Sequence, residues 1–285
     1  QFGLSSVGFG VWFINYLKNV VLNTLEYAVI GGAVAWAFVF LPKRWPWALT
    51  LGYVVAAMLI AFIYPSVIAP IFDKFYPLQD QAILGDIRDL TDKAGMEVGE
   101  VLVMEASVRT ARANAYFAGV GGSRQVVLYD NLINTHTQEQ VKLVVAHEMG
   151  HWRYGHVAKG LAFSAIGVAG VLLAFSLAVG RMPPSSYASL ERTLLLLLIV
   201  STLAGYVLSP ASSFISRKHE VAADAYSLEL TADPGTFIST QLNLSRSNLS
   251  DVEPPLFMRW FSWTHPTTLD RINAAVEWDA SQGTR

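Results

Sequence analysis

Long apolar runs, uncharged apart from Lys18 and Glu26 in the first, alternate with polar stretches along this chain of 285 residues. A helix needs roughly 20 mostly apolar residues to cross the hydrocarbon core of a membrane. Runs of about that length or longer cover residues 11–41, 45–65, 160–180 and 193–213. Tryptophan and tyrosine lie near their ends, as is typical of membrane interfaces. Buried helices of a soluble protein would rarely produce four such runs, so the pattern predicts four transmembrane helices.

Two polar regions remain, residues 73–156 and 217–285, and two predicted spans separate them. They should therefore lie on the same side of the membrane, where residues near 147 and 220 can meet. Six basic residues flank the spans on that side and four on the other, which favours a cytoplasmic location for the polar regions. The one turn-rich linker is "RMPPSSYAS", residues 181–189.

The first polar region shows the pattern of a mixed α/β fold. Residues 81–95 have helical spacing of apolar positions and end at a glycine, while residues 99–107 have the composition of a strand. Residues 114–133 contain two β-type runs around a glycine-rich turn, which predicts a hairpin. Thr137 and Gln140 then form a capping-box pattern, so a helix should begin there.

Composition supports the membrane interpretation and restricts the chemistry. Hydrophobic residues make up 53% of the chain and charged residues 15%, with a mean hydropathy of +0.38 and a net charge of −2. Neither a basic patch nor a polybasic tail points to nucleic acid. With no cysteine in the sequence, a metal would have to be bound by histidine and carboxylate. The chain starts at Gln1 without a signal-peptide pattern, so we expect a fragment or a processed form.

The segment "HEMGH", His147 to His151, matches the zinc-binding pattern H-E-x-x-H. Imidazoles at positions i and i+4 of a helix lie on one face and can reach the same ion. The glutamate between them, Glu148, would accept a proton from a water that the metal activates. A helix that carries two histidines by coincidence is the alternative, and the predicted helix phase argues against it.

Such a site needs a third protein ligand, and two patterns compete for this role. The metzincin pattern requires a histidine at position 158, where the chain has Ala158. His156 would lie about 180° around the helix from His147, off the ligand face. The second pattern takes a glutamate from another helix, and "SRKHEVAADAYSLEL" supplies Glu220 with Asp224 one turn later. Asp224 would accept a hydrogen bond from the spare N–H of a ligand histidine, and we expect this histidine to be His147.

Several motifs together resemble the integral-membrane zinc metallopeptidases of the CAAX prenyl protease 1 type, relatives of the HtpX heat-shock proteases. They are "YPSVIAPIFDKFYPL", "NAYFAG", "VVLYDNLI", "HEMGHWRYGH", "SRKHEVAADAYS" and "THPTTLDRI", spread over residues 64–276. Members of that type have seven spans around a chamber inside the membrane, whereas this chain shows four. The resemblance implies one Zn²⁺ per chain, held by His147, His151 and Glu220, with Glu148 as the general base. It also implies that Asp224 supports one of the ligand histidines by a hydrogen bond.

The resemblance also implies where the substrate lies. Residues Asn114, Ala115, Tyr116 and Phe117 would form an edge strand on which a peptide pairs. His265 would contact the substrate or the oxyanion beside the metal, although Thr264 as N-cap and Pro266 in the first turn of a helix would explain the same residues. Arg271 could bind substrate, pair with a carboxylate near the site, or face solvent. His136 and His219 are expected at the surface.

The expected fold is a mainly α integral membrane protein with about four transmembrane helices and a mixed α/β, gluzincin-like zinc peptidase domain that contains a short β-hairpin. We expect transmembrane helices in 1–64, a peptidase part in 65–156, a transmembrane hairpin in 157–216 and a second peptidase part in 217–285. The expected activity is hydrolysis of peptide or protein substrates at the bilayer, with prenylated CAAX-type C-termini as one candidate and HtpX-like quality control as another. A metal-binding transporter or a chaperone-like binder is the non-proteolytic alternative, and Glu148 argues for hydrolysis.

Overall fold

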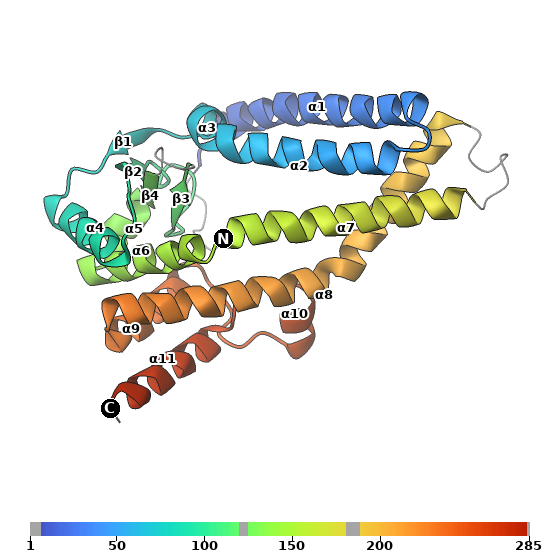
Figure 1. Ribbon diagram of the computed structural model, residues 1–285. Coiled ribbons are helices and arrows are strands. Elements are labelled where there is room, and N and C mark those ends of the chain that lie inside the picture. The colour runs from blue at the N-terminus through green and yellow to red at the C-terminus, as the bar shows by residue number, and fades with distance from the viewer. Residues whose placement is uncertain (1–6, 120–124, 181–188, 284–285) are drawn as a thin grey trace. The chain divides into compact units, whose positions relative to one another are not determined.

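The computed structural model describes residues 7–119, 125–180 and 189–283 (Figure 1). Contacts within the chain divide it into two units. The membrane unit comprises residues 9–61 and 157–211, and the mixed α/β unit comprises residues 62–156 and 212–285 together with residues 7 and 8. Each unit is therefore built from segments that are far apart in the sequence.

The membrane unit contains the four predicted spans. They are α1 (Phe9–Phe40), α2 (Trp45–Ile63), α7 (His156–Val179) and the first part of α8 (Leu190–Thr231). All four are long and apolar enough to cross a membrane, so the prediction of four spans is confirmed. Large apolar side chains cover their outer surfaces, while a small cluster around Trp45 and Phe175 is buried between them. The predicted linker lies at residues 181–189, of which 181–188 fall outside the described residues.

A four-stranded sheet forms one part of the mixed α/β unit. Its strands are β1 (Phe75–Pro77), β2 (Glu100–Met104), β3 (Ala115–Ala118) and β4 (Gln125–Tyr129), in the order β1-β2-β4-β3. β3 and β4 pair antiparallel as predicted, whereas β2 and β4 are parallel. The prediction missed the three-residue β1, and it extended the second β-type run into residues 130–133, which belong to helix α5 (Asp130–Thr135).

Helix α6 (Gln138–Arg153) lies at the centre of this unit. Its start is fixed by the predicted capping box between Thr137 and Gln140. Val141, Val145 and Met149 are fully buried on one face of the helix, and α6 packs against β3, α4 (Gln81–Ala94) and α9 (Pro234–Ser247). Since the same helix carries the H-E-x-x-H motif, the hydrophobic core of the unit fixes the position of that motif.

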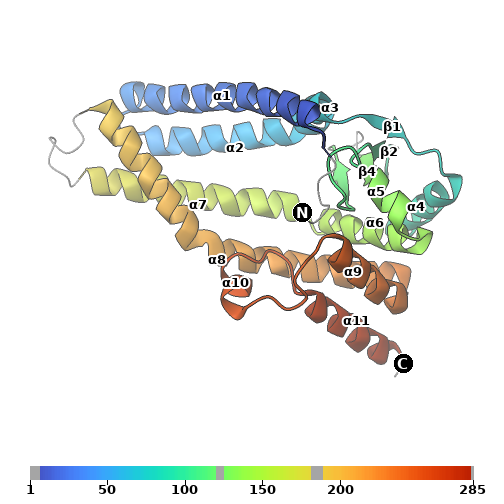
Figure 2. The same ribbon diagram turned by 180° about the vertical axis from the view of Figure 1, so that it is seen from behind.

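The remaining helices are short or C-terminal. A π-helical turn (Tyr64–Ile68) and α3 (Ala69–Phe72) precede the sheet, and α10 (Leu256–Phe261) precedes α11 (Thr268–Gln282). Helices α9 and α11 pack side by side, as both views show (Figure 1 and Figure 2). Thr267 caps α11 with Asp270 in a second capping box. The alternative in which Thr264 caps this helix is therefore wrong.

Candidate metal centre

Two histidines of α6 and one glutamate of α8 bring their donor atoms together. The Nε2 atoms of His147 and His151 are 3.1 Å apart. Glu220 places Oε2 at 3.4 Å from Nε2 of His147 and Oε1 at 3.3 Å from Nε2 of His151. All three side chains are largely buried. Among the described residues, this is the one group of three or more histidines and carboxylates with the spacing of a metal site.

The spacing of these donors tests whether zinc fits them. Zinc binds imidazole nitrogen at 2.0–2.1 Å and carboxylate oxygen at 2.0–2.2 Å, so two donors on a tetrahedral ion lie roughly 3.3–3.5 Å apart. The observed separations of 3.1–3.4 Å agree with this edge length. A histidine, histidine and carboxylate set is also a known ligand set of catalytic zinc. The residues therefore fit a zinc ion held by three protein ligands.

A glycine inside the motif allows the two metal-binding helices to approach each other. A Cβ at Gly150 would lie 2.8 Å from Cα and 3.1 Å from the carbonyl oxygen of Ala223 on α8. Ala223 itself is fully buried. Sequence reasoning treated Gly150 as an unspecified position of H-E-x-x-H, and the absence of a side chain there is what brings Glu220 within reach of both histidines.

Asp224 holds the other ring nitrogen of His147. Its Oδ1 atom lies 2.9 Å from His147 Nδ1. Arg271 donates to both oxygens of Asp224, with a distance of 2.7 Å from Nε to Oδ2 and a second, short bond from Nη2 to Oδ1. Burial lowers the pKa of His147, but the carboxylates of Asp224 and Glu220 outweigh it and raise the pKa to about 10. The site thus stabilises positive charge strongly, as a metal site must.

His156 contacts the second ligand histidine, contrary to the sequence argument. The predicted direction of His156 requires one continuous helix, but α6 ends at Arg153, Gly155 adopts φ +62°, and α7 begins at His156. The turn places His156 Nδ1 3.0 Å from Nδ1 of His151, with 7% of His156 exposed. His156 therefore belongs to the surroundings of the metal centre, although its nitrogen faces the ligand histidine and not the donor cluster.

Two other histidines are less exposed than expected. His219 is partly buried and stacks on His156, with ring centroids 4.1 Å apart. His136 is also partly buried, because the end of α5 packs against the core. The expectation that both lie at the surface is wrong, since a single charged or polar residue in the sequence gives no sign of its burial.

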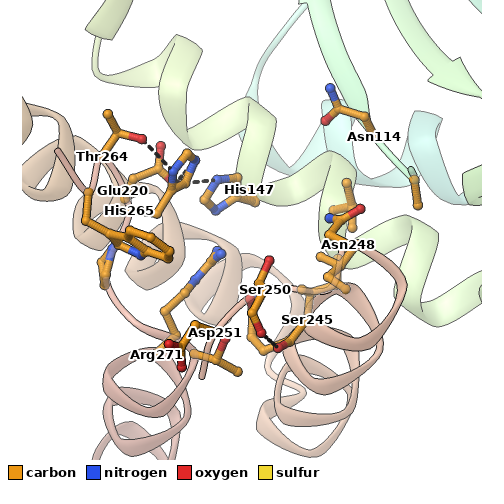
Figure 3. Close-up of a pocket in the computed structure, with 18 of the residues that line it drawn as sticks. Asn114, His147, Glu220, Ser245, Asn248, Ser250, Asp251, Thr264, His265 and Arg271 are labelled. Atoms are coloured by element: carbon orange, nitrogen blue, oxygen red, sulfur yellow. Dashed lines mark hydrogen bonds and ion pairs between the residues drawn. The ribbon is translucent and has the colours of Figure 1, made fainter. Parts of the chain in front are cut away.

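A cleft of about 440 Å³ opens beside the donor cluster (Figure 3). Glu148 lines it, and burial raises the pKa of this carboxyl. His265 lines it too, with Nε2 3.6 Å from Glu220 Oε2, and partial desolvation in the cleft lowers the pKa of His265. Figure 3 shows His265 and Glu220 next to His147 at one end of the cleft. Arg271 lines the cleft as well, and its pairing with Asp224 matches one of the alternatives open from the sequence.

The predicted substrate residues divide between two environments. Asn114 lines the cleft, while Ala115 is buried and Phe117 packs against Trp152 at a ring distance of 5.3 Å. Tyr116 lines a second, smaller pocket formed with prolines and apolar side chains beside the sheet. β3 lies at the edge of the sheet, as predicted.

The far end of the cleft comes from residues that the sequence argument missed. Gln241, Ser245 and Asn248 on and after α9 line it. Figure 3 shows the last two beside Ser250 and Asp251. Gln241, Ser245 and Asn248 follow one another at intervals of four and three, so they share one face of the helix. Polar residues occur on every face of α9, so no signal in the sequence separates these three from the rest.

Comparison with known proteins gives consistent matches along the chain. Residues 77–279 match the family model described as Peptidase family M48, and residues 1–74 match the one described as CAAX prenyl protease N-terminal, five membrane helices. A Bacillus subtilis protein described as an uncharacterized metalloprotease, YhfN, is 30% identical over 243 residues, or 82% of this chain. CAAX prenyl protease 1 of Saccharomyces cerevisiae is 28% identical over 302 residues, or 96% of this chain.

A solved structure agrees with these sequence matches. The crystal structure of S. mikatae Ste24p superposes with a TM-score of 0.86 at 26% identity, covering 96% of this chain and 68% of that protein. The chain spans 56% of the length of YhfN and 65% of the length of the S. cerevisiae relative.

Proposed function

The chain belongs to peptidase family M48, and from that premise we propose that it is a membrane-embedded, zinc-dependent endopeptidase. Four apolar helices make it an integral membrane protein. The observation that carries the proposal is the trio of donor atoms from His147, His151 and Glu220, which are 3.1–3.4 Å apart at one end of a cleft.

When bound by these three residues, zinc would supply a Lewis acid that polarises the scissile carbonyl and lowers the pKa of a water. Glu148 follows His147 directly and lines the same cleft, so its carboxylate is the group that accepts the proton of the attacking water and passes it to the leaving amine. The raised pKa of this buried carboxyl brings it nearer to neutral pH, where a general base works best.

His265 has the position of an oxyanion donor. Its Nε2 is near the donor cluster, and its side chain is 58% exposed, so a substrate can reach it. An imidazole N–H can donate a hydrogen bond to the negative charge that develops on the carbonyl oxygen. Asp224 and Arg271 support the metal ligand His147. Asp224 contacts its ring, and Arg271 holds Asp224 in place.

The edge of β3 offers a place for the peptide backbone. Tyr129 N donates to Asn114 O, and in an antiparallel pair the residues that bond the partner strand alternate with those that do not. Tyr116 therefore bonds β4, while the backbone groups of Ala115 and Phe117 point away from it, toward the open edge. A substrate strand would pair with these two residues by β-augmentation.

C-terminal processing of prenylated CAAX-type proteins is the substrate class that we propose first. Its support is the set of relatives named CAAX prenyl protease 1, including those of yeast, human and plant. The excess of basic residues beside the spans supports a cytoplasmic active side. The relative YhfN is described only as a metalloprotease, and this favours a broader, HtpX-like quality-control protease as the second candidate.

The test uses purified protein with added zinc and two peptides of the same sequence, one prenylated and one not, with Glu148→Gln as the inactive control. Cleavage of the prenylated peptide alone would support CAAX processing. Equal cleavage of both would favour the broader protease. Cleavage of neither by the zinc-loaded protein would contradict the proposed activity.

A further inference from the structure

We propose that His156 is a positioning residue for the metal ligand His151. It accepts a hydrogen bond from the ring nitrogen of His151 that does not face the metal site, and so fixes both the tautomer and the ring angle of this ligand. The inference rests on the proposed zinc centre, but it concerns a residue outside the ligand set.

The ring atoms of His151 define the direction of this hydrogen bond. Its Nε2 atom faces the other two donors, at 3.1 Å from His147 Nε2 and 3.3 Å from Glu220 Oε1. A nitrogen that binds a metal keeps its lone pair for the metal, so the proton of a neutral His151 sits on Nδ1. This Nδ1–H points at Nδ1 of His156, 3.0 Å away. Nδ1 of His156 must then be the acceptor, and its own proton is on Nε2.

The ring of His156 is itself held in place. It stacks on His219 with centroids 4.1 Å apart and an angle of 9° between the planes, and Tyr154 lies 5.8 Å away at 29°. His219 directly precedes Glu220 on α8, so the stack joins the start of α7 to the helix that carries the third ligand. Gly155, with φ +62°, makes the sharp turn that brings His156 back to His151.

The two ligand histidines consequently have different supports. His147 is held by a carboxylate that is itself paired with Arg271, whereas His151 is held by a neutral imidazole. A charged acceptor gives a stronger hydrogen bond than a neutral one. Loss of the His156 acceptor should therefore weaken zinc binding by about tenfold, at the lower end of the 10–100-fold range typical of residues that support ligands.

Two substitutions separate the hydrogen bond from the packing of the ring. His156→Asn keeps an acceptor oxygen near the place of Nδ1 but removes the ring, and His156→Phe keeps a ring that can stack on His219 but has no acceptor. The zinc dissociation constant is measured in the full-length chain by competition with a chelator, and the d–d absorption of the Co²⁺-substituted protein reports the ligand geometry.

We expect His156→Asn to bind zinc within about threefold of the wild type, and His156→Phe to bind roughly tenfold more weakly with a changed Co²⁺ spectrum. If His156→Phe does not fold, His156→Leu replaces it. This variant also lacks an acceptor, and like His156→Asn it lacks the ring. Normal affinity and an unchanged spectrum in the variant without an acceptor would overturn the proposal, as would an equal loss in both variants.

The binding measurements distinguish this proposal from the proposed function because they need no turnover. Unaltered zinc binding in every His156 variant of an active enzyme would remove the positioning role alone. If the His156 variants show the expected zinc affinities but the protein hydrolyses no peptide, the positioning role is supported and the peptidase activity is contradicted. A wild type that binds no zinc would overturn both.

Discussion

Gly150 and Ala223 lie in backbone contact where α6 crosses α8, and a Cβ on Gly150 would come within 2.8 Å of Ala223 Cα. The tight crossing is not required by the H-E-x-x-H pattern, which leaves this position open. It determines how closely Glu220 approaches His147 and His151, because Ala223 is one helical turn from Glu220 on α8.

Gly150→Ala should therefore separate the two helices. Overpacking of a buried contact costs about 1–3 kcal/mol, and the shift should weaken zinc binding as well. The midpoint of thermal unfolding and the zinc dissociation constant measure the two effects. Gly85→Ala in α4 is the matched control, because a Cβ there meets nothing within 4 Å, and alanine should stabilise this helix by up to about 1 kcal/mol. A Gly150→Ala variant as stable as the wild type would contradict the packing argument.

The sequence predicted the elements of the fold better than the surroundings of the site. The spans depend on apolar length, and the capping box and the pairing of His147 with His151 depend on spacing along one helix, and such signals are local. The contact between Gly150 and Ala223 joins residues from separate helices, and nothing local marks it. His156 is outside the donor trio, as predicted, but its direction differs because Gly155 ends the helix on which the predicted direction depended. The alternative that made Thr264 the cap of α11 is wrong because Thr264 and Thr267 both suit an N-cap, and the sequence alone does not choose between them.

Glu148→Gln should abolish hydrolysis while leaving zinc bound. The amide keeps the size of the side chain but cannot accept the proton of the attacking water, and loss of a general base typically costs on the order of 10²-fold or more in rate. Single-turnover cleavage of a peptide and the zinc content of the purified variant test both halves of the statement. Activity within a few-fold of the wild type would remove Glu148 from the base role.

Glu220→Ala should reduce the zinc content sharply, because two imidazoles remain as the only protein ligands. Glu229→Ala, an exposed glutamate on the same helix, is the matched control and should retain zinc. Metal analysis after gel filtration measures both variants. Full zinc occupancy in Glu220→Ala would show that the third ligand lies elsewhere.

The burial of His136 predicts how the stability of the fold depends on pH. Burial lowers the pKa of His136 below its usual 6.5, and its Nε2 atom is buried without a hydrogen-bond partner. The unfolded chain, with the ordinary pKa, then takes up a proton before the folded protein does. The titration of this side chain costs no stability well above pH 6.5, and the free energy of unfolding falls as the pH drops from 6.5 toward the lowered pKa of the folded state.

His136→Gln removes this titration and should flatten the acid side of the profile. Unfolding midpoints of both proteins between pH 7.5 and about 5.5 give the measurement, and their difference isolates His136 from the other histidines. Parallel profiles would mean that His136 is solvated in the folded protein.

His265→Ala should lower kcat more than it raises KM. His265 Nε2 lies 3.6 Å from Glu220 Oε2 at the mouth of the cleft, beside the three donor atoms and outside the hydrogen-bond network of Asp224. A hydrogen bond that forms only as charge develops on the carbonyl oxygen contributes to the transition state and little to substrate binding. Removal of one such donor typically costs about 10²–10³ in kcat. Steady-state kinetics on one peptide separate the two constants, and the zinc content serves as the control because His265 is not among the ligands. A variant with normal kcat and a raised KM would assign His265 to substrate binding.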